Sequence, residues 1–194
     1  TEYSSSDAVM AIQYAIDKVN ALGGGVVFLR RGYYPVSDRI ILRDNIVLRG
    51  EGWGTFVEMA TTPPAQRPVF GLYGVRNVAI MNLKVSGGEP AETENRAEAG
   101  VFIGGGSKNV VVTNVYARGA KYPIYIGGGS QNNWNEDIIV YGNIAEYAYD
   151  DCITATLYSR RVIIANNIAR YAKDTPDLGN SGIELDDSVE DVIV

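Results

Sequence analysis

The fold is decided by the stretch Asn109-Val110-Val111-Val112-Thr113-Asn114-Val115. It joins a polar residue, a run of β-branched residues, an asparagine and a further aliphatic residue. Related stretches at residues 77–83, 137–144, 161–168 and 191–194 give repeat starts that are 32, 28, 24 and 30 residues apart. Self-similarity at such a period is typical of stacked structural units. The β-branched runs indicate strands, and no helical stretch lies between them to form a crossover. We therefore predict a coil of parallel strands.

Composition narrows the classes of function. The 194 residues are 46% hydrophobic, which is enough for one domain with a sizeable core. The net charge of −6 makes nucleic acid and anionic membranes poor partners. Histidine is absent, so a Ser-His-Asp triad and the common histidine-containing zinc sites are excluded. Cys152 is the only cysteine, so an internal disulfide is excluded as well.

The order of motifs predicts a single domain of three parts. Residues 1–25 form a helical cap, because apolar residues recur at helical spacing from Ala8 to Val19 before Gly23-Gly24-Gly25. Residues 26–76 form the first coils, with strands at 26–29, 39–42 and 46–49 and an irregular segment at 55–74. Residues 77–194 form the regular repeats, and Val194 falls in mid-strand. We therefore expect a fragment or an open end, which a homo-oligomer or another end-to-end contact would complete.

The beginning of the chain resembles a known superfamily. The residues that carry the resemblance are Gly23-Gly24-Gly25-Val26-Val27-Phe28-Leu29 and Ile46-Val47-Leu48-Arg49-Gly50-Glu51-Gly52-Trp53-Gly54-Thr55. They are similar to the N-terminal cap and first coils of the pectate-lyase-like superfamily. The resemblance implies an all-β fold, a single-stranded right-handed parallel β-helix with an N-terminal capping helix. Lyases, hydrolases, epimerases, tailspikes and inert surface proteins share this fold, so function has to be argued from the site.

The repeats also predict which side chains stack. Two inward columns are expected, one of Ile80, Val112, Val140 and Ile164, and one of Leu83, Val115, Ile144 and Ile168. At the intervening turn, an amide ladder is expected, formed by Asn82, Asn114, Asn143 and Asn167.

Long turns at residues 86–99 and 173–181 predict the walls of a groove, because short turns lie between them. Alignment of the repeats places Lys121, Asp150 and Asp174 in one column of its floor. Neighbouring carboxylates raise each other's pKa, so one of them is a candidate general acid. A lysine or arginine there could hold a uronate carboxylate, and tyrosines offer flat faces to sugar rings. The predicted substrate-binding residues are Tyr122, Arg118, Tyr147, Tyr171 and Asp174.

Two further resemblances suggest catalytic roles. Tyr149-Asp150-Asp151-Cys152-Ile153 is similar to the Asp-Asp-Cys-Ile motif of polygalacturonases, which implies that Asp150 and Asp151 are the acid and base of an inverting hydrolase. The third aspartate and the histidine of that family are missing here. Lys121, Tyr149 and Asp151 resemble a set in alginate epimerases and lyases. That resemblance implies that Tyr149 exchanges the C5 proton while Lys121 neutralises the uronate, and here too the family's histidine is missing.

The sequence thus predicts an extracellular or cell-surface protein that cleaves or modifies an acidic, uronate-containing polysaccharide. The catalytic candidates are Asp150, Asp151, Lys121 and Tyr149. The alternative is a non-catalytic β-helix module, such as a tailspike, adhesin, surface-layer or filament component, in which Lys121 and Asp150 form a simple ion pair. No cofactor is expected. Calcium is an alternative at an acidic group that we interpret first as a solvated face, formed by Glu184, Asp186, Asp187, Glu190 and Asp191.

Overall fold

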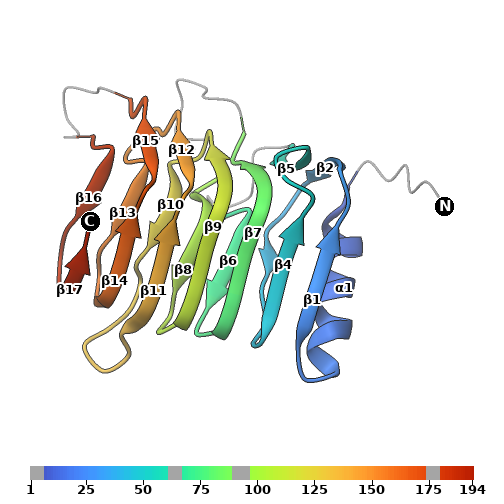
Figure 1. Ribbon diagram of the computed structural model, residues 1–194, viewed down its shortest axis with the longest axis horizontal. Helices are drawn as coiled ribbons and strands as arrows, with labels where there is room; N and C mark the ends of the chain where they lie inside the picture. Colours follow the sequence, from blue (N-terminus) through green and yellow to red (C-terminus); the bar gives the residue numbers. More distant parts are fainter. Residues whose placement is uncertain (1–6, 61–66, 89–96, 174–179) are drawn as a thin grey trace.

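A computed structural model of the chain describes residues 7–60, 67–88, 97–173 and 180–194. The chain is a right-handed parallel β-helix, as predicted, in which successive coils stack side by side (Figure 1). The ladders between named strands are all parallel in the described residues. Stacking of equivalent positions therefore brings residues together that lie roughly one repeat apart in sequence.

The strands form two sheets. The main path of the large sheet consists of β1 (Gly25–Leu29), β4 (Ile46–Gly50), β7 (Arg76–Ser86), β9 (Lys108–Arg118), β11 (Asn135–Tyr141), β14 (Ser159–Ala165) and β17 (Val189–Ile193). A side branch pairs with the later parts of β7 and β9 and consists of β2 (Gly32–Val36), β5 (Thr55–Met59), β12 (Ile144–Glu146) and β15 (Ile168–Arg170).

The second sheet follows the side branch in each coil. It consists of β3 (Ile40–Ile41), β6 (Phe70–Tyr73), β8 (Ala99–Gly104), β10 (Tyr122–Ile126), β13 (Ile153–Ala155) and β16 (Ile183–Leu185). We call it the six-stranded sheet. The strands β2, β5 and β6 were not predicted from the sequence. β2 contains Pro35 and, among the described strands, pairs with β5 alone, and proline is tolerated in such an edge strand.

The helix α1 (Val9–Ala21) covers the first coil, beside β1 (Figure 1). Its Ile12 and Ile16 are buried in the core, and the helix packs against β1, β3 and β4. The Asp7 carboxylate accepts the Val9 N–H at 3.1 Å near the start of the helix. The predicted cap is therefore present. It removes the apolar end of the coil from water.

The first predicted core column is confirmed. Ile80, Val112, Val140 and Ile164 pair in register across four coils and are at most 1% exposed. The second column holds for Leu83 and Val115 only.

The second column fails at Ile144 and Ile168, because the turn shifts by one residue in the later coils. Asn82 and Asn114 take the left-handed conformation in the earlier coils, but Gly142 and Asn166 take it in the later ones. Ile144 consequently pairs with Tyr116, and Ile168 is 50% exposed.

The predicted amide ladder therefore divides into two. Asn114 Nδ2 donates to Asn82 Oδ1 at 2.8 Å on the outside. Asn143, which is 1% exposed, points inward and donates to Asn167 Oδ1 at 3.0 Å. Its amide also accepts the Val115 N–H and donates to the Val112 carbonyl, each at 2.9 Å. Asn143 thus satisfies two buried backbone groups.

Candidate functional site

The candidate site lies at the corner where each coil passes from the side branch to the six-stranded sheet. Three successive coils contribute side chains to it, and backbone hydrogen bonds hold the coils together. The Asp150 N–H donates to the Lys121 carbonyl at 3.0 Å, and the Cys152 N–H donates to the Ser181 carbonyl at 3.1 Å. We define the corner cluster by its side chains, which are Lys121, Tyr122, Asp150, Asp151 and Glu184.

Lys121, Tyr122 and Asp150 meet in the first half of the cluster. The Tyr122 hydroxyl donates to Asp150 Oδ2 at 2.9 Å, and the Lys121 ammonium lies 3.7 Å from the same oxygen. Lys121 also lies over the Tyr122 ring, 5.1 Å from its centroid. Burial, followed by the hydrogen bond to Asp150, raises the pKa of Tyr122. Tyr122 is therefore a neutral hydrogen-bond donor, and the predicted meeting of Lys121 with Asp150 is present.

Asp151 and Glu184 form the second half. The Asp151 side chain is buried and its Oδ1 accepts the Ser181 N–H at 2.6 Å. It also lies within hydrogen-bonding distance of the Glu184 carboxyl group on β16. Burial raises the pKa of Asp151. Burial and the neighbouring Asp151 raise the pKa of Glu184 to about 7. The second half of the cluster thus holds a proton near neutral pH.

A row of aromatic side chains leads to the corner cluster across the outer face of the six-stranded sheet. Ring centroids are 5.1 Å apart for Tyr73 and Phe102, 5.4 Å for Phe102 and Tyr125, and 4.7 Å for Tyr125 and Tyr122. We call Tyr73, Phe102, Tyr125 and Tyr122 the aromatic row. Phe102 is mostly covered, whereas Tyr73 is 41% exposed.

Thr154 continues this face between the aromatic row and the acidic pair. It pairs in register with Tyr125 on one side and with Glu184 on the other. Thr154 is 2% exposed, and within the described part of the chain its Oγ1 has no hydrogen-bond partner. A buried hydroxyl without a partner is rare and points to a missing interaction.

Neither the role of Glu184 as a site residue nor the aromatic row was predicted from the sequence. The available signal was one position in each strand of the six-stranded sheet, because Phe102, Tyr125, Thr154 and Glu184 share one register. Alternation places that position outside the coil.

Two other predicted tyrosines form a separate group. Tyr147 and Tyr171 stack as predicted, with centroids 5.0 Å apart and ring planes at 20°. The Arg118 guanidinium lies 5.1 Å from the Tyr147 centroid. Among the described residues, no hydrogen bond, ion pair or ring contact joins this trio to Asp150 or Lys121.

Tyr147 and Tyr171 have φ of 56° and 59°, in the left-handed region that is uncommon for bulky residues. In the preceding coil Gly119 has φ of 70°. Strained positions of this kind cluster at functional sites, but they persist only where the surroundings hold them.

The remaining predicted residues are placed as follows. Tyr149 lies at the corner, with the Lys173 ammonium 4.8 Å from its ring centroid. Asp174 lies outside the described residues, as do 89–96 and 174–179 of the two predicted groove walls. Cys152 is buried, and burial raises the pKa of its thiol to about 11, which disfavours a role as nucleophile.

Metal binding receives no geometric support in the described ranges, where no group of three or more acidic, histidine or cysteine side chains is placed to hold an ion. Of the predicted acidic group, Glu184 faces Asp151, whereas Asp186 and Asp187 are exposed in the following turn. The calcium alternative stays a prediction.

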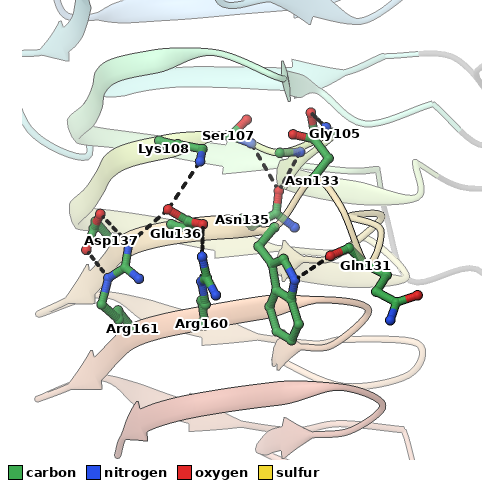
Figure 2. A network of polar contacts seen from close by, with 12 residues as sticks. Gly105, Ser107, Lys108, Gln131, Asn133, Asn135, Glu136, Asp137, Arg160 and Arg161 are labelled. Atoms are coloured by element: carbon green, nitrogen blue, oxygen red, sulfur yellow. Dashed lines mark hydrogen bonds and ion pairs between the residues drawn. The ribbon is translucent and has the colours of Figure 1, made fainter.

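A second polar network surrounds Glu136 on β11, which follows the C-terminal end of β10 in the six-stranded sheet (Figure 2). The Glu136 carboxylate contacts Lys108 at 3.2 Å, Arg160 at 2.6 Å and Arg161 at 2.9 Å. Burial opposes the effect, but hydrogen bonds from these three cations lower the pKa of Glu136 to about 2. Arg161 also contacts Asp137 at 2.8 Å. Opposite charges are paired here, which favours a structural role.

Comparison with known proteins supports the fold. No family model matches the chain. Over 132 residues the chain is 34% identical to mannuronan C5-epimerase AlgE6 of Azotobacter vinelandii, a match that spans 58% of this chain but only 15% of that enzyme.

Two solved structures extend the likeness. The A-module of mannuronan C5-epimerase AlgE4 from Azotobacter vinelandii has a TM-score of 0.64 at 20% identity, covering 96% of this chain and 66% of that one. Tailspike gp49 of Acinetobacter baumannii bacteriophage Fri1, a capsular polysaccharide depolymerase, has a TM-score of 0.70 at 16% identity. The match covers 98% of this chain and 40% of the tailspike chain. The chain shares the parallel β-helix fold of these proteins. The resemblance of its cap and first coils to that superfamily is confirmed at the level of fold.

Proposed function

We propose that this protein cleaves or modifies a polysaccharide that lies across the aromatic row with its reacting residue at the corner cluster. The main support for this proposal is the corner cluster. Three coils bring a lysine, a tyrosine hydroxyl and three carboxyl groups together on one half-exposed surface. A proton donor and an ion-paired carboxylate side by side are suited to acid–base chemistry.

The aromatic row supports a carbohydrate as the substrate. Tyrosine and phenylalanine rings offer apolar faces, and the Tyr125 and Tyr73 rings lie on the same side of the sheet as Glu184. Because the row crosses neighbouring coils, the glycan would run along the axis of the β-helix. The relatives named above act on polysaccharides, which agrees with this proposal.

Two cations favour an acidic glycan. Lys121 is 36% exposed and 3.7 Å from its carboxylate partner, and Lys173 lies over Tyr149 nearby. Either ammonium could hold a uronate carboxylate. An extracellular or cell-surface location is part of the same proposal, since acidic polysaccharides of this kind coat cells. Among the described residues, no helix is long and apolar enough to cross a membrane.

The test is product analysis on a panel of pectic, alginate, capsular and neutral polysaccharides, with and without calcium. New reducing ends, unsaturated uronates and exchange of the C5 proton are each measured. We expect Asp150→Asn and Lys121→Ala to lose at least about 100-fold in rate, and Asp137→Asn, in the distant Glu136 network, to retain it. Binding without any product would favour the non-catalytic module, and neither binding nor product would refute the proposal.

A further inference from the structure

The acidic half of the corner cluster contains a contact that ionised groups cannot make. Asp151 and Glu184 lie within hydrogen-bonding distance of each other. Ionised carboxylates only accept hydrogen bonds, so one of the two must carry a proton for the contact to be favourable. The two carboxyl groups, which come from neighbouring coils, therefore share one proton.

The geometry decides which partner holds the proton. Asp151 Oδ1 accepts the Ser181 N–H at 2.6 Å, an interaction that stabilises its ionised form. Among the described residues, no backbone N–H donates to Glu184. Glu184 is also only half-buried, whereas Asp151 is 2% exposed. The proton thus resides on the partner that a ligand can reach.

We propose that Glu184 is a further catalytic residue, which receives its proton from the pair with Asp151 and delivers it to the glycosidic oxygen of the bound glycan. This inference rests on the proposed function. Glu184 is well placed for the role because it shares a register row with Thr154 and Tyr125, at the end of the aromatic row. The buried Thr154 hydroxyl, which has no hydrogen-bond partner among the described residues, lies beside it in the same row.

The reaction is a hydrolysis with water as co-reactant. The O–H bond of Glu184 breaks while an O–H bond forms on the glycosidic oxygen. The bond between that oxygen and the anomeric carbon breaks, and its electron pair stays on the oxygen. Water adds its oxygen to the anomeric carbon and gives one proton to the Asp150 carboxylate. Glu184 thus loses one proton to the leaving oxygen and Asp150 gains one from water, and exchange with solvent restores both groups.

The first arm of the test needs no substrate. In protein labelled with ¹³C at the glutamate carboxyl carbons, the Glu184 signal is assigned by its loss in Glu184→Gln, and its titration midpoint is measured. We expect a midpoint near 7, which moves down by at least about one unit in Asp151→Asn because the neighbouring charge is removed. A wild-type midpoint in the ordinary glutamate range would overturn the shared proton.

The second arm measures catalysis. Glu184→Gln keeps an N–H donor toward Asp151 but cannot release a proton. We expect it to bind the glycan as the wild type does and to turn over at least about 100-fold more slowly. The matched control is Glu190→Gln, on the exposed surface of β17, which should remain active. Products formed in H₂¹⁸O should carry ¹⁸O at new reducing ends.

The outcomes separate the two claims. An active protein whose Glu184→Gln variant stays within threefold of the wild type overturns the role of Glu184 and leaves the proposed function standing. Unsaturated or epimerised products without new reducing ends overturn the hydrolysis. A wild type that neither binds nor alters any glycan overturns the proposed function and the proton transfer together, while the titration still decides on the shared proton.

Discussion

Tyr122 and Asp150 belong to neighbouring coils, and the Tyr122 hydroxyl donates a hydrogen bond of 2.9 Å to Asp150 Oδ2. The bond fixes one carboxylate oxygen on the same side as the Lys121 ammonium. Asp150 therefore has a defined orientation before any substrate arrives.

Removal of this hydroxyl should impair the rate more than the fold. Tyr122→Phe keeps the ring contact with Tyr125 but frees the Asp150 carboxylate. We expect kcat on the best polysaccharide substrate to fall about tenfold with little change in KM, and the free energy of unfolding to fall by about 1 kcal/mol. Tyr125→Phe is the control. An equal loss of kcat in both variants would contradict a specific role for the Tyr122 hydroxyl.

The rate should depend on the protonation of Glu184. Because its pKa is raised to about 7 and the protonated form is the donor, activity should decline as the pH rises through about 7. A pH profile of kcat checks this, and Asp151→Asn should shift the decline to lower pH. A rate that stays constant from pH 6 to pH 9 would exclude Glu184 as the donor.

Loss of a ring from the aromatic row should weaken binding. Tyr125→Ala removes the contacts to both Phe102 and Tyr122, and we expect the dissociation constant for an oligosaccharide to rise about tenfold, or about 1.4 kcal/mol. Tyr141→Ala removes an exposed tyrosine from the large sheet and is the control. Isothermal titration calorimetry compares the two, and equal affinities would place the ligand elsewhere.

Asn143 should matter for stability although it is polar. Asn143→Ala leaves the Val115 N–H and the Val112 carbonyl without their partner inside the core, which costs about 2–3 kcal/mol of unfolding free energy. The exposed Asn114→Ala should cost less than about 1 kcal/mol. Urea unfolding measures the free energy of unfolding of both variants. Similar losses would show that the buried Asn143 amide contributes no more to stability than the exposed Asn114 amide.

The Glu136 network should stabilise the fold above acidic pH. Its folded-state pKa of about 2 lies below the ordinary value of 4.5, so the unfolded chain binds more protons between these values. The stabilisation is complete above about pH 5 and is lost as the pH falls toward 2. We expect Glu136→Gln to lose on the order of 2 kcal/mol at pH 7.

Thermal unfolding across pH tests this difference. The gap between Glu136→Gln and the wild type should close toward pH 2, because the wild-type carboxylate is then protonated as well. Asp137→Asn, whose side chain is more exposed, should lose less than about 1 kcal/mol at pH 7. A gap that is constant with pH would mean that packing, and not charge, holds this corner.

Much of the fold could be predicted from sequence, because a parallel coil repeats its inward positions. The column through Val112 is visible as a recurring β-branched run. The shift at Gly142 could not be predicted from the asparagines alone, since Asn143 and Asn167 match the pattern by type but occupy the next position in space. The strand β2 could not be predicted because proline normally argues against a strand. Pro35 is tolerated there because β2 is an edge strand.

The candidate site was predicted where its residues lie in the short turns or directly after them. Lys121 and Asp150 stand out there as charged residues beside short loops, and the structure brings them together. Glu184 and Tyr125 are single outward residues in strands of different coils. Their proximity depends on the register between coils, which a single sequence does not specify.

The most direct test is a crystal structure of the Glu184→Gln variant with an oligosaccharide of the substrate found in the panel. We expect sugar rings along the aromatic row, with a glycosidic oxygen within hydrogen-bonding distance of residue 184. An oligosaccharide bound instead on the Tyr147 and Tyr171 stack, with the corner cluster free of sugar, would contradict it.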